Sequence, residues 1–375
     1  MPRKYRLKNY DFLLVLLAVL ISIYGIFIIG SAKTSFQPRQ IGGLCLGIAL
    51  MVVISLVDYQ TVLNFYWVFY ILNIVLLLAV QFFGREVNNA TRWISIAGIQ
   101  FQPSEATKFL LILFFAKLIM KFKDKISRFG VLLILIALFA APWYLVYSQP
   151  DLSTSIVIFL IFVSMIFIGG LSWKIIGGVL AVTVPLAIIG LVLVIQPNQQ
   201  IIKGYQQTRI LAWLDPEKYS NQEAYQQQNS ITAIGSGQLT GKGYKNNEVA
   251  SVKNANFISE PQTDFIFAIV GEELGFMGSM AIVILVMAII LRIVQIGFGA
   301  DDLSGTLVCA GVAAHIGFQT FMNIAVATGL MPNTGIPLPF ISYGMTSLVC
   351  LFMEIGVVLN IGLQKIRENY FVFRA

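Results

Sequence analysis

A carboxylate stands where a polar segment of the sequence meets a long apolar one. Asp264 follows Glu260 and Thr263 in a polar stretch and directly precedes an apolar run. A charge held at the boundary between water and lipid is costly, so it usually has a function. Asp264 could act as a general base toward a substrate hydroxyl group. The structural alternative is that Thr263 or Asp264 caps the helix that begins here.

A second candidate is an acid and base pair that follows Pro103, a residue suited to the first turn of a helix. Glu105 and Lys108 are three residues apart, so on a helix they share one face and can neutralise each other. Such a pair could simply fix the packing of helices. Alternatively, Lys108 faces a water-filled cavity and binds an anionic group, and the spacing leaves both interpretations open.

Three further candidates lie in or beside predicted loops. Asp151 follows a Gln-Pro turn at the predicted start of a helix, where an acidic cap is favoured. Arg209 lies in an apolar pattern of helical period over 201–213, which predicts a short helix on the membrane surface. Lys242 lies in the glycine-rich segment 234–243, whose spacing excludes a nucleotide phosphate loop. The backbone amides of this segment and the Lys242 side chain could still approach a phosphate.

Several polar residues fall inside apolar runs. His315, Gln319 and Asn323 recur every four residues and form one stripe on a helix, which favours interhelical hydrogen bonds over a proton relay. Glu272 and Glu273 are too deep to be solvated charges, so at least one should have a partner or face a cavity. The single histidine lacks the nearby cysteine or second histidine that a zinc site needs.

These residues must be positioned by membrane helices. Hydrophobic residues make up 57% of the 375, charged residues 11%, and the mean hydropathy is +0.81, more apolar surface than a soluble fold could bury. We expect an all-α polytopic fold with about ten transmembrane helices. The expected spans are residues 11–31, 41–57, 62–83, 103–120, 130–148, 152–171, 175–196, 264–294, 303–330 and 343–363.

The distribution of Lys and Arg predicts the orientation. Basic residues concentrate in the N-terminal head, between 117 and 128, and in the tail, so both termini should be cytoplasmic. The basic head resembles a signal peptide, but no small-residue cleavage site follows, so the first span is expected to be a retained helix. The net charge of +7 then reflects this bias and contact with anionic lipid rather than nucleic acid. Segment 197–263, between spans seven and eight, is long enough to translocate regardless of charge and should form one large extracellular loop.

The last outer loop, 329–344, contains Pro332, Gly335, Pro337 and Pro339, which rule out a continuous helix. Irregular backbone at membrane depth is tolerated only against protein or water. The loop therefore predicts a re-entrant or cavity-lining backbone.

Taken together, six ordered motifs resemble the SEDS family of shape, elongation, division and sporulation proteins, which includes RodA, FtsW and SpoVE. The motifs are Arg92-Trp93, Gln102-Pro-Ser-Glu-Ala-Thr-Lys108, Gln149-Pro-Asp151, the Gly-Ser-Gly and Gly-Lys-Gly of 235–243, Thr263-Asp-Phe-Ile-Phe267 with Gly271-Glu-Glu-Leu-Gly275, and Pro332 through Gly344. Gln238, Ser259 and Met345 depart from the commoner family residues, which affects local loop geometry and not the match at Asp264. The resemblance implies a single SEDS transmembrane domain over 1–375, with 197–263 as an insertion.

The resemblance implies a peptidoglycan glycosyltransferase in the bacterial cytoplasmic membrane, with an extracellular active site. It would polymerise lipid II into β-1,4-linked strands in an elongation-type, RodA-like role. The alternatives are a division- or sporulation-type polymerase, a lipid II flippase, and a scaffold that only recruits the partner synthase. Expected partners are lipid II, a class B penicillin-binding protein and other elongation-machinery proteins. Asp264 would be the general base toward the 4-hydroxyl of the acceptor sugar, and inversion at the anomeric carbon needs no covalent intermediate.

The leaving diphosphate needs positive charge, and the lipid tail needs an apolar groove between spans. The outward cationic candidates are Arg92, Lys108, Arg209 and Lys242. Mg²⁺ or Mn²⁺ could share this role, although the sequence contains no dedicated metal cage. The outer carboxylates open to such an ion are Glu105, Asp151 and Glu260. With Asp264 as the catalytic residue, the expected substrate-binding residues are Arg92, Trp93, Gln102, Ser104, Glu105, Lys108, Asp151, Arg209, Lys242, Glu260, Thr263 and Ser342.

Overall fold

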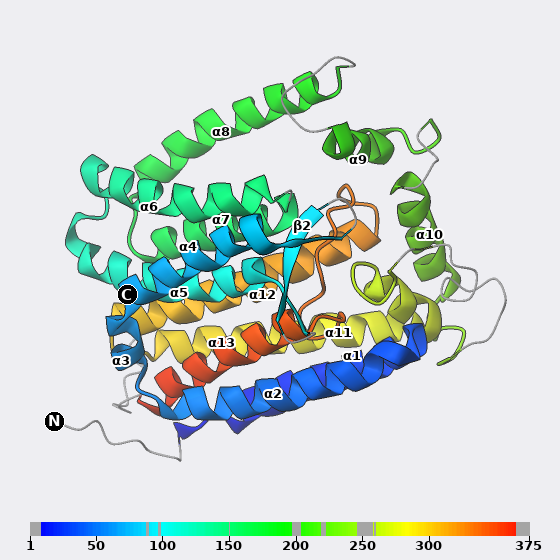
Figure 1. Ribbon diagram of the computed structural model, residues 1–375, viewed down its shortest axis with the longest axis horizontal. Coiled ribbons are helices and arrows are strands. Elements are labelled where there is room, and N and C mark those ends of the chain that lie inside the picture. Colours follow the sequence, from blue (N-terminus) through cyan, green and yellow to red (C-terminus); the bar gives the residue numbers. More distant parts are fainter. Residues whose placement is uncertain are drawn as a thin grey trace, which may run out of the picture.

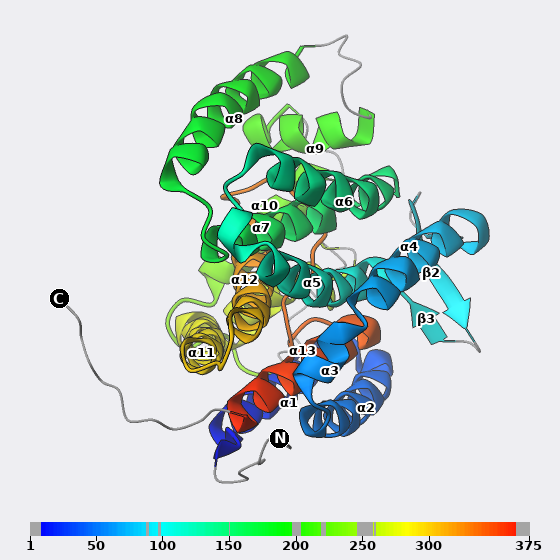
Figure 2. The same cartoon turned by 90° about the vertical axis from the view of Figure 1, so that its left-hand side faces the viewer.

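A computed structural model describes residues 9–87, 90–96, 99–149, 151–196, 204–218, 223–245, 258 and 260–364. It is a mostly helical bundle whose long helices run roughly side by side (Figures 1 and 2). The first half contains α1 (Phe12–Ala32), η2 (Thr34–Phe36), α2 (Gln37–Leu56), α3 (Tyr59–Asn64), α4 (Tyr66–Phe83), α5 (Pro103–Lys121), η3 (Lys123–Lys125), α6 (Phe129–Ser148) and α7 (Leu152–Ile168). The second half contains α8 (Trp173–Val194), α9 (Gly204–Leu214), α10 (Glu223–Ser236), α11 (Ile266–Phe298), α12 (Leu303–Ala327) and α13 (Met345–Leu363).

The bundle has the character of a membrane protein. Among the described residues, seven helical segments are long and apolar enough to cross a membrane: Phe12–Ala32, Thr34–Leu56, Tyr66–Phe83, Phe129–Ser148, Ile266–Phe298, Leu303–Ala327 and Met345–Leu363. Large apolar side chains such as Phe12, Phe27 and Val68 are exposed on the outside of the bundle, as contact with lipid requires. The predicted spans 103–120, 152–171 and 175–196 coincide with α5, α7 and α8.

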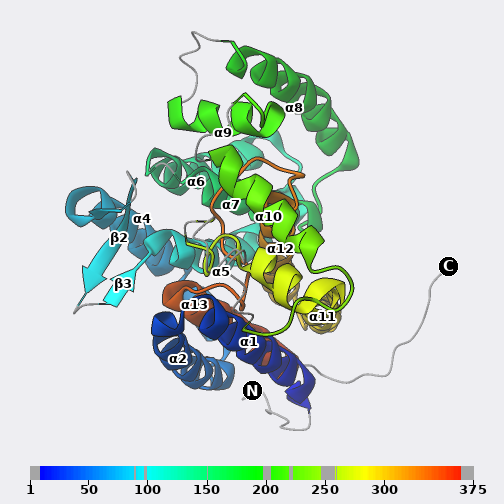
Figure 3. The same ribbon diagram turned by 90° about the vertical axis from the view of Figure 1, so that its right-hand side faces the viewer.

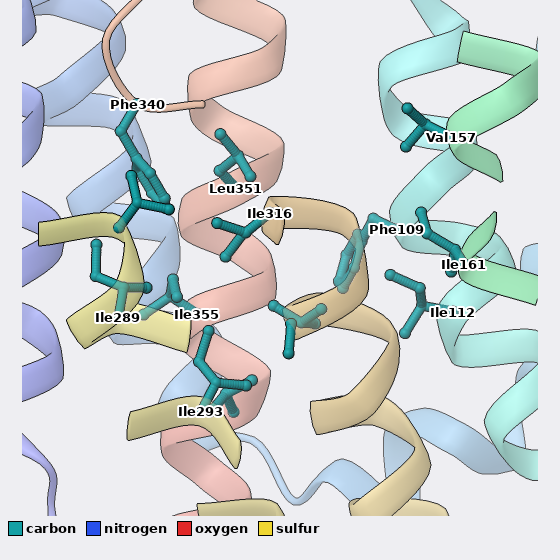
Figure 4. Packing of buried hydrophobic residues seen from close by; sticks show 14 of the residues in the cluster. Phe109, Ile112, Val157, Ile161, Ile289, Ile293, Ile316, Phe340, Leu351 and Ile355 are labelled. Carbon is teal, nitrogen blue, oxygen red and sulfur yellow. The ribbon is translucent and has the colours of Figure 1, made fainter. Parts of the chain in front are cut away.

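The core lies where α5, α12 and α13 meet α7 and α11. The side chains of α5, α12 and α13 are mostly buried, whereas α4 exposes most of its surface. Figure 4 shows Ile316 of α12 between Leu351 of α13 and Phe109 of α5, with aliphatic side chains of α7 and α11 on either side. The polar residues of α5 and α12 are therefore held by a packed apolar surround.

A small antiparallel sheet was absent from the all-α prediction. Strands β1 (Arg85–Val87), β2 (Ala90–Ile96) and β3 (Ile99–Phe101) pair in the order β1-β2-β3 in the connection between α4 and α5. Its central strand carries Thr91, Trp93 and Ile94, which favour extended backbone, but each strand is too short for a periodic signal. The sheet places Arg92 beside the start of α7, where its Nε donates to the carbonyl of Gln149 at 3.3 Å.

The segment predicted as a large loop contains two helices. The described part of α9 confirms the short helix around Arg209; Ile201 and Ile202 lie outside the described residues, as does Ser259. Helix α10 was not predicted. Figure 3 looks onto the end of the bundle that carries α9, α10, the sheet and the orange loop before α13. The predicted irregular backbone of this loop is confirmed, since no helix or strand occurs between α12 and α13.

Candidate active site

The site is built around Asp264, which lies in the turn that leads into α11. The N-cap position of α11 is Phe265, and no side chain caps the helix, so the capping alternative for Thr263 and Asp264 is wrong. The Asp264 carboxylate instead faces Gly335 of the loop before α13: a Cβ at Gly335 would lie 3.2 Å from Oδ2 of Asp264. Gly335 has φ of 67°, a left-handed conformation that glycine adopts without strain.

The turn and the loop are held together by side chains that bond backbone carbonyls. Nδ2 of Asn323 donates to the carbonyl of Asp264 at 2.9 Å and to that of Ile336 at 2.7 Å. The Ser342 hydroxyl donates to the carbonyl of Thr263 at 2.6 Å and accepts from the amide of Leu338 at 2.7 Å. Ser342 therefore fixes the backbone beside Asp264.

Charges from four segments act on the Asp264 carboxylate, which is half-buried. Burial raises its pKa from 3.8 to about 6, Arg209 and Arg92 oppose the rise, and Glu260 and Asp151 add to it. A carboxyl group with this pKa is largely ionised at pH 7, yet it is a stronger base than an ordinary aspartate. The fold thus brings the predicted Arg92, Asp151, Arg209 and Glu260 into one electrostatic neighbourhood with Asp264.

Asp151 organises the side of the site formed by β2, α5 and α7. As predicted, it caps α7, accepting from the amide of Thr154 at 3.3 Å. Its other oxygen accepts from the Ser104 hydroxyl at 3.1 Å and from Nε2 of Gln102 at 3.4 Å. Nη1 of Arg92 lies 3.8 Å from Oδ1 of Asp151. Capping therefore accounts for only part of its contacts.

Glu105 and Lys108 form the predicted ion pair, with Nζ of Lys108 2.8 Å from Oε1 of Glu105. Nζ also donates to Oε1 of Gln319 on α12 at 2.6 Å. The Lys108 side chain has an exposed fraction of 0% and that of Glu105 3%. The packing interpretation of the pair fits this geometry, and the ammonium group does not face open water in this conformation.

Lys242 makes its contacts with α11. Its Nζ pairs with Oε1 of Glu272 at 3.1 Å, and its amide donates to the carbonyl of Glu272 at 2.9 Å. The chain around it packs against a break in α11 at Gly275, where a Cβ on Gly241 would lie 2.2 Å from the carbonyl of Glu273. The glycines thus allow backbone to approach backbone, and the Lys242 amide offered to a phosphate is already bonded. The prediction that at least one of Glu272 and Glu273 has a partner is confirmed, since Lys242 pairs with Glu272 and Ser31 donates to Glu273 at 2.6 Å.

The remaining candidates have local roles in the structure. The Thr263 hydroxyl donates to the carbonyl of Glu260 at 2.9 Å and holds the turn before Asp264. The Glu260 side chain is exposed, and its backbone φ is 54°. Trp93 pairs with Arg85 across β1 and β2. Helix α9 is anchored by Trp213, whose Nε1 donates to the carbonyl of Gly329 at 2.9 Å.

The residues present do not fit a metal cage. Among the described residues, no group of three or more His, Cys, Asp or Glu side chains is placed to hold an ion. Glu105 is paired with Lys108, and Asp151 is bonded to Ser104 and Thr154. We therefore derive no step through Mg²⁺ or Mn²⁺.

The predicted stripe on α12 makes interhelical hydrogen bonds, as expected. His315 contacts Glu354 of α13, Gln319 binds Lys108 of α5, and Asn323 binds the turn at Asp264. Glu354 was missed in the sequence, although a carboxylate inside an apolar run of α13 is itself a signal of a functional or paired residue.

Comparison with known proteins assigns the family. The family model described as "Cell cycle protein", which covers FtsW, RodA and SpoVE, matches residues 7–366. The chain is 34% identical to the peptidoglycan glycosyltransferase MrdB of Escherichia coli strain K12 over 354 residues, covering 93% of this chain and 92% of that protein. It is 33% identical to the stage V sporulation protein E of Bacillus subtilis strain 168 over 371 residues, covering 94% and 96%.

Solved structures agree. A chain from a peptidoglycan synthase complex that coordinates polymerization and crosslinking matches with a TM-score of 0.77 at 28% identity, covering 94% of this chain and 97% of that one. The rod shape determining protein RodA of Thermus thermophilus matches with a TM-score of 0.71 at 26% identity, covering 96% and 98%. The resemblance seen in the motifs is confirmed: the chain belongs to the FtsW, RodA and SpoVE family of cell cycle proteins, the SEDS family.

Proposed function

We propose that this chain is a peptidoglycan glycosyltransferase that polymerises lipid II, with Asp264 as the general base. The observation that carries the proposal is a half-buried carboxylate that lies against the irregular loop at Gly335, with its pKa raised to about 6 and with the charges of Arg92 and Arg209 acting on it. Asp264 accepts the proton of the acceptor sugar's 4-hydroxyl group while the oxygen of that hydroxyl group attacks the anomeric carbon of the donor. The bond to the diphosphate breaks on the opposite face, which inverts that carbon.

The leaving diphosphate is stabilised by the two arginines. Both are partly exposed, and both act on the Asp264 carboxylate, so they can reach an anion bound beside it. Lys108 is fully buried against Glu105 and Gln319, so its charge acts from beneath the site rather than by direct contact. Gln102, Ser104 and Asp151 then orient Arg92 and the sugar-facing side of the site.

The lipid tail fits a groove on the side of the bundle. An apolar groove of about 550 Å³ lies between α7, α11 and α12, with Leu160, Ile290 and Phe321 among its lining residues. Met331, in the loop that continues to Gly335, also lines it. A prenyl chain in this groove would bring its diphosphate toward the loop beside Asp264.

The topology follows from this assignment. We infer ten spans formed by α1, α2, α4, α5, α6, α7, α8, α11, α12 and α13, with both termini cytoplasmic. The sheet, α9 and α10 then lie outside the cell with the active site, as an insertion and a loop of one domain. Expected partners are a class B penicillin-binding protein, in line with the matched synthase complex, and other elongation proteins. The RodA-like role belongs to the proposal, since the chain is nearly as similar to the stage V sporulation protein E as to MrdB.

The test is polymerisation of lipid II by the purified full-length chain with a class B penicillin-binding protein. Asp264→Asn should reduce the rate at least ~10²-fold, as expected for loss of a general base. Asp124→Asn makes the same chemical change at an exposed turn between α5 and α6 and should leave the rate unaltered. Retained polymerisation in Asp264→Asn would exclude the proposed mechanism. Lipid II flipping in liposomes that is insensitive to Asp264→Asn would favour the flippase alternative.

A further inference from the structure

A continuous set of buried polar side chains links α13, α12 and α5 beneath the site. Both carboxylate oxygens of Glu354 lie 2.9 Å from Nδ1 of His315. Nε2 of His315 lies 2.9 Å from Oε1 of Gln319, which also accepts from Nζ of Lys108 at 2.6 Å. All four side chains have exposed fractions of 1% or less. The proposed mechanism uses Lys108 but assigns nothing to Glu354 or His315.

The direction of the Gln319 amide is fixed by its neighbours. Nε2 of Gln319 donates at 3.0 Å to the carbonyl of Pro337, which can only accept. Reversing the amide would place two acceptors against each other and turn its NH₂ group toward the Lys108 ammonium. Oε1 must therefore face Lys108 and His315, and both must donate to it.

This geometry defines the proton on His315. Since Oε1 of Gln319 carries no hydrogen, Nε2 of His315 must be protonated. Nδ1 then shares one proton with Glu354, either as an imidazolium beside a carboxylate or as a neutral ring beside a carboxylic acid. Both arrangements are neutral overall and keep the donor to Gln319. The pair can therefore hold Oε1 of Gln319 in place without adding net charge beside Lys108.

The same stripe reaches the loop beside the catalytic carboxylate. Gln319 holds the carbonyl of Pro337, while Asn323 holds those of Ile336 and Asp264. Glu105 and Lys108 come from α5, and Asp264 comes from the turn before α11. The polar face of α12 is thus the element that connects the ion pair with the loop and the turn.

We propose that His315 and Glu354 are positioning residues for the transfer reaction: Nε2 of His315 holds Oε1 of Gln319 in place, and Gln319 in turn holds Lys108 against Glu105 and the carbonyl of Pro337 in the loop beside Asp264. The inference rests on the proposed function. It places no step of chemistry on His315, which touches neither substrate nor the reacting atoms.

Isosteric variants test the route through Gln319. In Glu354→Gln, His315 keeps a partner at Nδ1 and its donor at Nε2, so the turnover number should stay within about threefold of wild type. His315 is then replaced in the Glu354→Gln variant, so that removing the imidazole leaves no carboxylate buried and unpaired. His315→Gln keeps an N–H near the position of Nε2, whereas His315→Asn keeps one only near Nδ1. We expect His315→Asn to lower kcat about tenfold and His315→Gln much less, with the KM for lipid II little changed in either, because a small misplacement of charged groups acts on the chemical step.

A merely structural role predicts a different pattern. It would lower kcat equally for the two histidine variants, in proportion to a loss of thermal stability, and that result would overturn the proposal. Thr320→Val is the matched control, since it removes a hydroxyl of α12 that has no hydrogen-bond partner among the described residues, and it should change neither kcat nor thermal stability. A proton relay through the pair would make Glu354→Gln itself inactive or displace the pH profile, and either result would also overturn the proposal.

A second readout does not depend on activity. If His315 acts on Lys108 through Gln319, the losses of thermal stability caused by His315→Asn and by Lys108→Met should be non-additive, because the two residues share one partner. Additive losses would exclude the route even if the chain does not polymerise lipid II. Failure of the wild-type chain to polymerise lipid II with its partner, alongside non-additive losses, would instead count against the proposed function alone.

Discussion

Replacing the proposed base should stabilise the protein at neutral and alkaline pH. Burial holds the pKa of Asp264 at about 6 instead of 3.8, so ionising this group costs more in the folded chain than in the unfolded one. Stability from this group is fully present below pH 3.8 and is lost as the pH rises through about 6. Asn mimics the protonated carboxyl group, so Asp264→Asn removes this penalty.

The size of the effect follows from the two pKa values. A difference of about two units corresponds to about 3 kcal/mol of unfolding free energy at pH 8 and to about 1 kcal/mol at pH 4.5. The assay is reversible unfolding of the purified chain in mixed detergent and SDS, at both pH values, for wild type, Asp264→Asn and Asp124→Asn. Asp124→Asn, at an exposed turn, should show no such gain. A gain for Asp264→Asn that is zero at pH 8, or equal at the two pH values, would refute the idea that the site holds a destabilised carboxylate.

Three further outcomes are expected from the same geometry. The polymerisation rate should fall about tenfold per pH unit below pH 6, and Arg209→Gln should move this limb to higher pH, because Arg209 lowers the pKa of Asp264; an unmoved limb in a pH–rate profile would contradict this. Gly335→Ala adds a Cβ 3.2 Å from the Asp264 carboxylate and should lower kcat about tenfold or more. The control is Gly329→Ala, at a similar positive φ but without contact with Asp264. It should destabilise the fold and have a smaller effect on kcat in the folded fraction. Gly317→Leu, which projects into the apolar groove, should raise the KM for lipid II about tenfold and affect a short-chain analogue less, and equal effects on both substrates would exclude the groove as the tail site.

The long helices could be predicted because runs of apolar residues in lipid leave few alternatives to a helix. Asp264, Asp151 and Glu105 could be selected because ionisable groups at the ends of such runs are costly. The sheet around Arg92 could not, since its strands gain their stability from pairing with one another rather than from a pattern within each strand. The position of Lys242 could not be predicted either, because it depends on a tertiary contact between the segment around Lys242 and the break in α11 at Gly275.

The cations of the site differ in a way that their spacing in the sequence does not reveal. Arg92 and Arg209 remain partly exposed, and both act on Asp264, so in the proposed mechanism they are the cations that bind the diphosphate as it arrives and leaves. Lys108 is sealed between Glu105 and Gln319, where exchanging either partner for substrate would leave a buried polar group unpaired. A buried pair of this kind is costly to open, so it suits a permanent part of the scaffold rather than a site of exchange. Loss of Lys108 should therefore act through kcat and stability, whereas loss of either arginine should act on the binding and departure of the diphosphate.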